Sequence, residues 1–119
     1  LLAAMPGDDD QEILHVPGAE AMVYVAGAEG CREAGNEKFR AGDVKGAAVD
    51  YEEALKRLAM APPAELLLDL GLLARAKACR IPTALNLALC CLRAEPHKAY
   101  RALELCEEVL EEEPGNAKA

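Results

Sequence analysis

Apolar residues recur at three- and four-residue spacing over most of the chain, and this is the pattern of amphipathic helices. The clearest run covers residues 44–60, where one side of a helix would carry Ala47, Tyr51, Ala54, Leu55 and Leu58. Pro62-Pro63 follows directly and would stop a helix, because proline has no amide hydrogen to donate. The pattern therefore predicts a helix over residues 44–60.

The same spacing predicts a helix on either side of this segment. One covers residues 19–41 and ends at Gly42-Asp43, so that it would form an antiparallel hairpin with residues 44–60. Another covers residues 64–94, within which we expect a break or bend at Pro82, since proline clashes with the preceding helical turn.

Two further helical segments are predicted towards the end of the chain. Residues 98–113 are bounded by Glu95-Pro96 before them and Pro114-Gly115-Asn116 after them. Residues 117–119 are expected to begin another helix. The fold class predicted from these elements is all-α, which agrees with an aromatic content of only 3%.

The two predicted hairpins are related in sequence. The apolar positions of the first reappear in the second at an offset of 55 residues, as Ala47, Tyr51 and Ala54 against Ala102, Cys106 and Val109. An internal repeat is therefore predicted. Residues 62–80 would then form a long insertion between the two repeats, and about two extra residues would lie near Pro96.

Residues 1–18 differ from the rest in composition. Pro6-Gly7 and Pro17-Gly18 are turn signals, and Asp8-Asp9-Asp10 lies between them with little apolar periodicity. The three aspartates lack the spaced oxygen ligands and closing Glu of a calcium loop, so solvated charge is the better interpretation. We predict a flexible acidic linker or tail over residues 1–18 and one domain over residues 19–119.

Charge and chemistry restrict the possible functions. The net charge of −8 argues against binding to nucleic acid or to an anionic membrane, although one basic groove could still attract an acidic peptide. No serine is present, the two histidines are His15 and His97, and no glycine-rich phosphate loop precedes a helix. We therefore expect neither an enzyme nor a bound metal or cofactor.

The five cysteines are odd in number and fall mostly on predicted apolar helix faces. Buried thiols in a reducing compartment fit this placement better than a disulfide scaffold does, so a cytoplasmic protein is predicted. A metal or redox role is the alternative, but no Cys-x-x-Cys spacing supports it. The five are Cys31, Cys79, Cys90, Cys91 and Cys106.

A series of positions, in order along the chain, resembles a known repeat family. The first repeat is carried by Gly35-Asn36, Phe39, Gly42-Asp43, Ala47, Tyr51 and Ala54-Leu55, and the second, with the start of a third, by Asn86-Leu87-Ala88, Cys106, Leu110, Pro114 and Asn116-Ala117-Lys118-Ala119. These residues resemble tetratricopeptide repeats of the co-chaperone type. The insertion and the loop 93–100 are most similar to the tetratricopeptide repeat protein 9 family, or to immunophilins that contain such repeats.

The resemblance implies an α-solenoid of about two repeats and the start of a third, with residues that bind a peptide. In the co-chaperone type, basic and amide side chains hold the C-terminal carboxylate of heat-shock protein 90 or 70. The matching positions here are Arg32, Asn36, Asn86 and Lys118. Arg32 replaces the usual Lys, and the expected Arg one turn beyond Lys118 would lie past residue 119.

Other interpretations remain open. Asn36 could satisfy backbone groups near a close packing contact at Gly35, and Arg32 and Lys118 could be solvated surface charges. The repeats could form a structural scaffold that contacts a folded partner through apolar helix faces, or could direct a larger peptidyl-prolyl isomerase to a chaperone. The C-terminal end, without a polar capping helix, could also self-associate.

Overall fold

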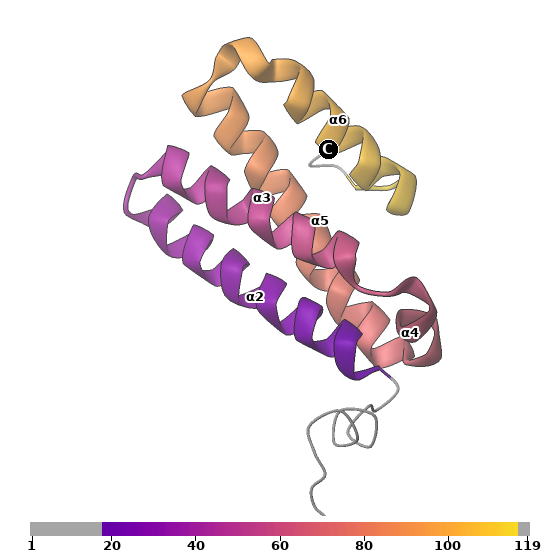
Figure 1. Ribbon diagram of the computed structural model, residues 1–119. Coiled ribbons are helices and arrows are strands. Elements are labelled where there is room, and N and C mark those ends of the chain that lie inside the picture. The colour runs from indigo at the N-terminus through magenta and orange to yellow at the C-terminus, as the bar shows by residue number, and fades with distance from the viewer. Residues whose placement is uncertain (1–17, 117–119) are drawn as a thin grey trace, which may run out of the picture.

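The computed structural model describes residues 18–116, and every regular element in this range is helical. Figure 1 shows their arrangement. The all-α prediction is confirmed for this part of the chain. In order, the elements are α2 (Ala19–Arg40), α3 (Val44–Met60), α4 (Pro63–Leu68), α5 (Leu70–Ala94), the short 3₁₀ helix η1 (Pro96–Lys98) and α6 (Ala99–Glu112).

Helices α2 and α3 form the first antiparallel hairpin, and local chemistry sets the turn between them. Gly42 adopts a φ of 88°, a left-handed conformation that glycine reaches without the steric cost of a Cβ atom. Asp43 then caps α3, because its side chain accepts a hydrogen bond of 2.9 Å from the amide of Gly46. The predicted boundary at Gly42-Asp43 is thus confirmed.

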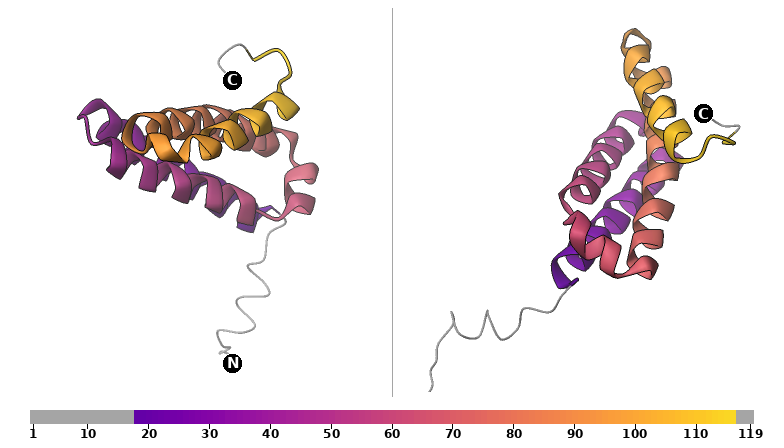
Figure 2. Two further views of the ribbon diagram at one scale, coloured as in Figure 1. Left: turned by 90° about the horizontal axis from the view of Figure 1, so that it is seen from above. Right: turned by 90° about the vertical axis from the view of Figure 1, so that its right-hand side faces the viewer.

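Helices α5 and α6 form the second hairpin, and α5 lies against the first (Figure 1). Seen from above, the two hairpins form two layers, which α4 joins at one end (Figure 2). Helix α5 lies close to every other helical element, whereas the backbone of α6 lies close only to those of α5 and η1 among residues 18–116. Helix α6 reaches α3 through side chains, as in the Arg101–Glu52 ion pair. The central position of α5 decides where the candidate site forms.

Two features of residues 62–94 differ from the sequence prediction. The chain breaks at Asp69, not at Pro82, and the Asp69 side chain caps α5 by accepting a 3.1 Å hydrogen bond from the amide of Leu72. Helix α5 runs through Pro82 without interruption. Pro82 has no amide hydrogen to donate to the carbonyl of Ala78 one turn earlier. Ala78 is exposed to water, so the missing hydrogen bond costs little there.

The insertion over residues 62–80 is largely helical and contributes to a hydrophobic core of its own. It supplies α4 and the first turns of α5, whose buried residues pack against the first half of α2. The main core lies between α3, α5 and α6. The insertion cluster includes Ala21, Val25, Leu66, Leu72 and Ala76; the main core includes Tyr51, Ile81, Leu87, Leu105 and Val109.

Several sequence predictions fall on residues that the structure does not describe. The acidic linker or tail lies outside the described range except for Gly18, which precedes α2. Lys118 and the helix expected to begin at residue 117 lie outside it as well. Among the helices between residues 18 and 116, none is long and apolar enough to cross a membrane.

Candidate peptide-binding site

Three of the four residues predicted to bind a peptide lie near one tyrosine hydroxyl. Arg32 and Asn36 lie one turn apart on α2, and the Asn36 side-chain oxygen accepts a 2.7 Å hydrogen bond from the Tyr51 hydroxyl of α3. Asn86 of α5 and Arg32 both approach closely enough to influence the pKa of the same hydroxyl. The site is therefore shared by α2, α3 and α5, while Lys118 lies outside the described residues.

A glycine on α2 allows the Tyr51 ring to come this close. A Cβ atom on Gly35 would lie 2.7 Å from Cε1 of Tyr51 and 3.3 Å from the carbonyl oxygen of Ala47. Tyr51 is only 1% exposed, so its ring has little room to move away. Gly35 thus lets α2 and α3 approach until the Tyr51 hydroxyl reaches Asn36.

We expect Gly35→Ala to lower the free energy of unfolding by about 1–3 kcal/mol, because the added methyl group overlaps a rigid aromatic ring. Chemical denaturation followed by circular dichroism would measure this. Gly30→Ala on the same helix is the control, since no atom lies within 4 Å of its added Cβ. That variant should gain about 0.5–1 kcal/mol from helix propensity, and equal losses in the two would contradict the packing argument.

The Tyr51 hydroxyl remains a hydrogen-bond donor at neutral pH. Burial raises its pKa, and the hydrogen bonding of Asn86 and the charges of Arg32 and Arg40 act in the opposite direction without reversing the shift. Because the oxygen of the Asn36 amide accepts from Tyr51, its nitrogen is left with no hydrogen bond within the described residues. The Asn36 amide nitrogen can therefore donate to a ligand.

Arg32 differs from most of the other arginines of the structure. It forms no ion pair with any carboxylate of residues 18–116, and its buried Nε atom has no hydrogen-bond partner there. By contrast, Arg75 lies 2.6 Å from Glu29, and Arg80 lies 2.6 Å from Glu112. Binding an anion is favourable for a half-buried guanidinium without a counter-charge, because the anion accepts the hydrogen bonds that the protein leaves unmade.

The Arg80–Glu112 pair links α5 to α6 through two hydrogen bonds of 2.6 Å each. The hydrogen bond from Arg80 holds the pKa of Glu112 below its ordinary value of 4.5. A carboxyl group whose pKa is lower in the folded state than in the unfolded state stabilises the folded protein at any pH above its unfolded pKa. This contribution disappears as the pH falls through the folded pKa, because the group is then protonated in both states. This pair therefore stabilises the second hairpin at neutral pH but not in acid.

We expect Glu112→Gln to lower the free energy of unfolding at pH 7 by about 1 kcal/mol. The difference from the wild type should shrink as the pH falls below about 4.5, because Glu112 of the wild type then becomes protonated too. Urea unfolding at neutral and acidic pH would measure both effects. Glu108→Gln on the same helix is the control, because Glu108 has no ion pair within residues 18–116; a loss that is the same at every pH would argue against the pair.

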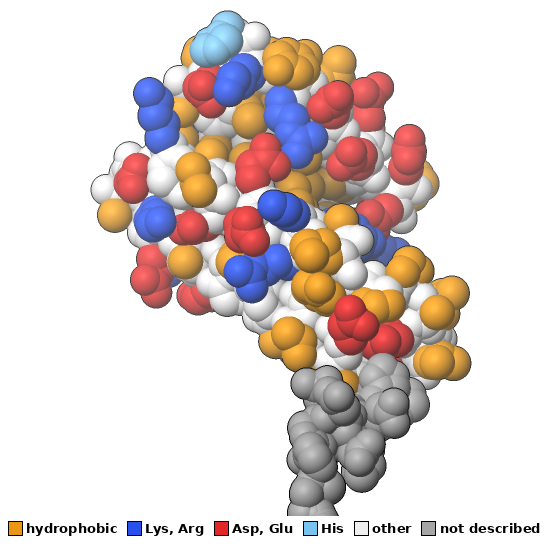
Figure 3. Space-filling view, viewed as in Figure 1, with side chains coloured by type: hydrophobic (Ala, Val, Ile, Leu, Met, Phe, Trp, Pro, Cys, Tyr) orange, Lys and Arg blue, Asp and Glu red, His pale blue; other side chains and the backbone are white. Residues whose placement is uncertain are grey.

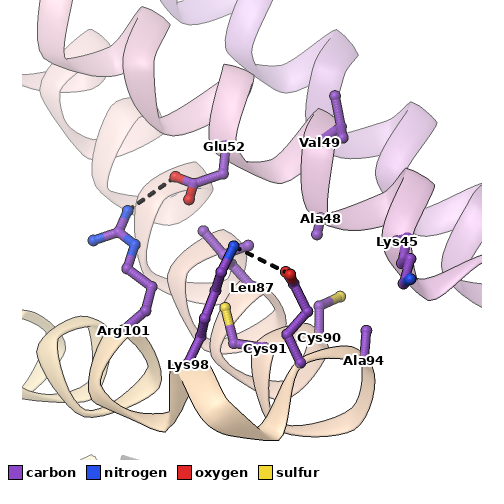
Figure 4. Close-up of a pocket in the computed structure, with 11 residues that line it drawn as sticks. Lys45, Ala48, Val49, Glu52, Leu87, Cys90, Cys91, Ala94, Lys98 and Arg101 are labelled. Atoms are coloured by element: carbon purple, nitrogen blue, oxygen red, sulfur yellow. Dashed lines mark hydrogen bonds and ion pairs between the residues drawn. The ribbon is translucent and has the colours of Figure 1, made fainter.

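A hollow of about 350 Å³ lies between α3, α5 and the start of α6. Figure 4 shows its floor of Leu87, Cys90 and Cys91, below the charged ends of Lys98 and Arg101. Lys98 is paired with Glu95 at 3.1 Å, and Arg101 with Glu52 at 2.9 Å, so both cations are already neutralised. Lys45, the third cation of this hollow, has no ion pair within residues 18–116, but it is exposed, so water solvates its charge. Arg32 differs in having a buried Nε without a partner, so its surroundings suit an anion better.

The five cysteines are free thiols, and no cluster of three potential metal ligands occurs among the described residues. Burial raises the pKa of Cys79, Cys90 and Cys91, and that of Cys90 reaches about 11 against an ordinary value of 9.0. Thiolate is the nucleophilic form, so the interior thiols are poor nucleophiles.

In the folded protein at pH 8, we expect iodoacetamide to modify the half-buried Cys31 and Cys106 first. Cys90 should react at least about tenfold more slowly, because it is fully buried and its pKa is high. Peptide mapping by mass spectrometry would give the order of modification. In urea, all five should react at similar rates, and rapid modification of Cys90 in the folded state would contradict the burial described above.

Comparison with models of protein families, with curated proteins and with solved structures gives no match. The candidate site therefore depends on the geometry of its own residues. Sequence analysis found Arg32, Asn36 and Asn86 but treated Tyr51 only as a repeat position. The sequence did contain a signal for Tyr51, because it lies one turn from Ala47 and Ala54 on a predicted buried helix face. A buried hydroxyl needs a hydrogen-bond partner, so a polar residue was to be expected beside it.

Proposed function

We propose that this protein is a protein–protein interaction module of the tetratricopeptide-repeat type, which binds the acidic C-terminal tail of a partner such as heat-shock protein 90 or 70. The observation that carries the proposal is Arg32, a half-buried cation without a counter-charge among the described residues, one turn from Asn36. Its place beside Asn86 and Tyr51 adds further polar groups. The function is recognition without catalysis.

The chemistry of these groups suits a carboxylate. Arg32 offers a planar guanidinium that can hold a carboxylate through two parallel hydrogen bonds, and the unused amide nitrogen of Asn36 offers another donor on the same helix face. Because α2 and α5 belong to different hairpins and both reach the Tyr51 hydroxyl, a peptide bound to Arg32 and Asn86 would bridge the two hairpins. Affinity would come from charge-assisted hydrogen bonds and would fall with added salt.

The test is a titration of the protein with a labelled peptide that ends in Glu-Glu-Val-Asp, followed by fluorescence anisotropy at low and physiological salt. We expect the peptide with a free carboxylate to bind, and its amidated form to bind at least about tenfold more weakly. Arg32→Gln should cause a loss of similar size. This variant should leave stability nearly unchanged, since Arg32 has no ion pair in residues 18–116 that the change would break.

Two further variants separate binding from folding. Asn36→Ala also removes the acceptor of the Tyr51 hydroxyl, so it should be compared with Tyr51→Phe, which removes the same bond from the other side. We expect only Asn36→Ala to weaken the binding of the peptide. Lys45→Ala on the exposed face of α3 is the control for general charge. Equal binding of the free and amidated peptides, or an equal loss from Lys45→Ala, would refute the proposal.

A further inference from the structure

No element of residues 18–116 covers the apolar face of the second hairpin that lies away from the first. We define the outer face as Leu85, Leu89 and Leu92 of α5 with Leu103, Cys106 and Leu110 of α6. Leu92 is 50% exposed and Leu103 is 61% exposed. A hollow of about 330 Å³ is lined by Leu85, Leu89, Leu92 and Cys106 together, so the apolar stripes of the two helices meet. An apolar face of this kind marks a surface for interaction.

Beyond the outer face, the surface of α5 continues far enough to accept a helix. A second hollow of about 320 Å³, beside Pro82, lies further along α5 and includes Ala74 at its far end. One cation, Lys77, and one anion, Glu113, also line it. From Ala74 to Leu92, helix α5 rises by about 27 Å, which is the length of a helix of about 18 residues. The first hairpin shows how such a surface is filled, because α5 itself lies across both α2 and α3.

The charge beside the outer face shows what kind of helix would fit. Among the glutamates of α6, Glu104 and Glu112 have arginine partners, whereas Glu107, Glu108 and Glu111 form no ion pair within residues 18–116. Figure 3 shows acidic side chains gathered over α6. Glu107 and Glu111 follow Leu103 at successive turns, so they flank the apolar stripe on that helix.

We propose that the outer face binds an amphipathic helix of a partner protein, with leucine-like side chains on one side and lysine or arginine along its edge. The apolar side would cover Leu89, Leu92 and Leu103, and the basic edge would meet Glu107 and Glu111. A second copy of this chain would instead bring the same unpaired glutamates into a two-fold contact, where they would repel each other. The outer face borders the peptide site, because Asn86 also lines the hollow at Leu85, but none of the residues that define the outer face belongs to that site.

The test uses the 119-residue chain and a labelled 18-residue peptide, helical by design, with leucines on one side and lysines along both edges. Matched peptides carry glutamates in place of the lysines, or the same composition in scrambled order. Fluorescence anisotropy should show binding of the basic peptide alone. A variant with both Leu92→Ser and Leu103→Ser should bind the basic peptide at least about tenfold more weakly. A variant with both Glu107→Gln and Glu111→Gln should bind it at least about threefold more weakly.

Leu68→Ser on α4 is the matched control, because Leu68 is 79% exposed and lies outside the outer face. Its affinity for the basic peptide should equal that of the wild type, and circular dichroism would verify that each variant is folded. Similar binding of all three peptides, no binding of any, or an equal loss from Leu68→Ser would overturn the proposal. Analytical ultracentrifugation completes the test by measuring whether the protein is a monomer or a dimer. If the wild type is a dimer and the variant with Leu92→Ser and Leu103→Ser is a monomer, the outer face binds a second copy instead of a partner helix.

Discussion

Replacing Tyr51 with alanine is expected to lower the free energy of unfolding by about 3–5 kcal/mol, the range for removing a buried aromatic ring. Tyr51 is 1% exposed and packs between Gly35 of α2 and the main core. Its loss would leave a cavity where the two hairpins meet and would free Asn36 from its hydrogen bond. Urea unfolding followed by circular dichroism would measure the loss.

Tyr51→Phe separates the contribution of the ring from that of the hydroxyl. The ring and its packing against Gly35 remain, so only the hydrogen bond to Asn36 is lost, and we expect a decrease of about 1 kcal/mol. The two losses together assign most of the effect to packing. If Tyr51→Phe costs as much as Tyr51→Ala, the polar group and not the ring holds the hairpins together, and the packing argument fails.

The second large effect is expected at Leu105, which lies on the inner side of α6 and is fully buried. Leu105→Ala should lower the free energy of unfolding by about 2–5 kcal/mol, because it removes apolar contacts and leaves a cavity in the main core. Leu105 belongs to the core that α3, α5 and α6 share, so its truncation weakens the packing of the two hairpins on each other as well as that of α6 on α5. Thermal and urea unfolding would both report the change.

Leu103 provides a control on the same helix. It lies two residues before Leu105 but is 61% exposed, so Leu103→Ala should change the free energy of unfolding by no more than about 0.5 kcal/mol. The contrast tests the orientation of α6 directly. Equal losses at Leu103 and Leu105 would mean that α6 presents a different side to α5.

The helices could be predicted from the sequence because their signals are local. The spacing of Ala47, Tyr51 and Ala54 and the turn at Gly42-Asp43 place two helices correctly without any knowledge of tertiary contacts. The break at Asp69 could not be placed in this way. Its cap is local too, because Asp69 accepts from Leu72 three residues on, but an aspartate within a helical pattern is a weaker signal than Pro82, which is accommodated within α5.

The candidate site could be predicted only in part, for a similar reason. Arg32 and Asn36 lie four residues apart, so a common helix face followed from their spacing alone. That Asn36 accepts from Tyr51 depends on how closely α2 and α3 approach, and Gly35 sets this distance through a contact between different helices. The outer face likewise becomes visible only when α5 and α6 are seen together.

The order of contacts along the chain has a consequence for how the protein folds. Helix α3 packs on α2, α5 packs on both, and α6 packs on α5 and η1, so most contacts join elements that are close in sequence. Such contacts need only short loops to close, and the entropy lost before they form is small. We expect folding within microseconds to milliseconds, as for other helical proteins of low contact order, with either hairpin able to begin the process.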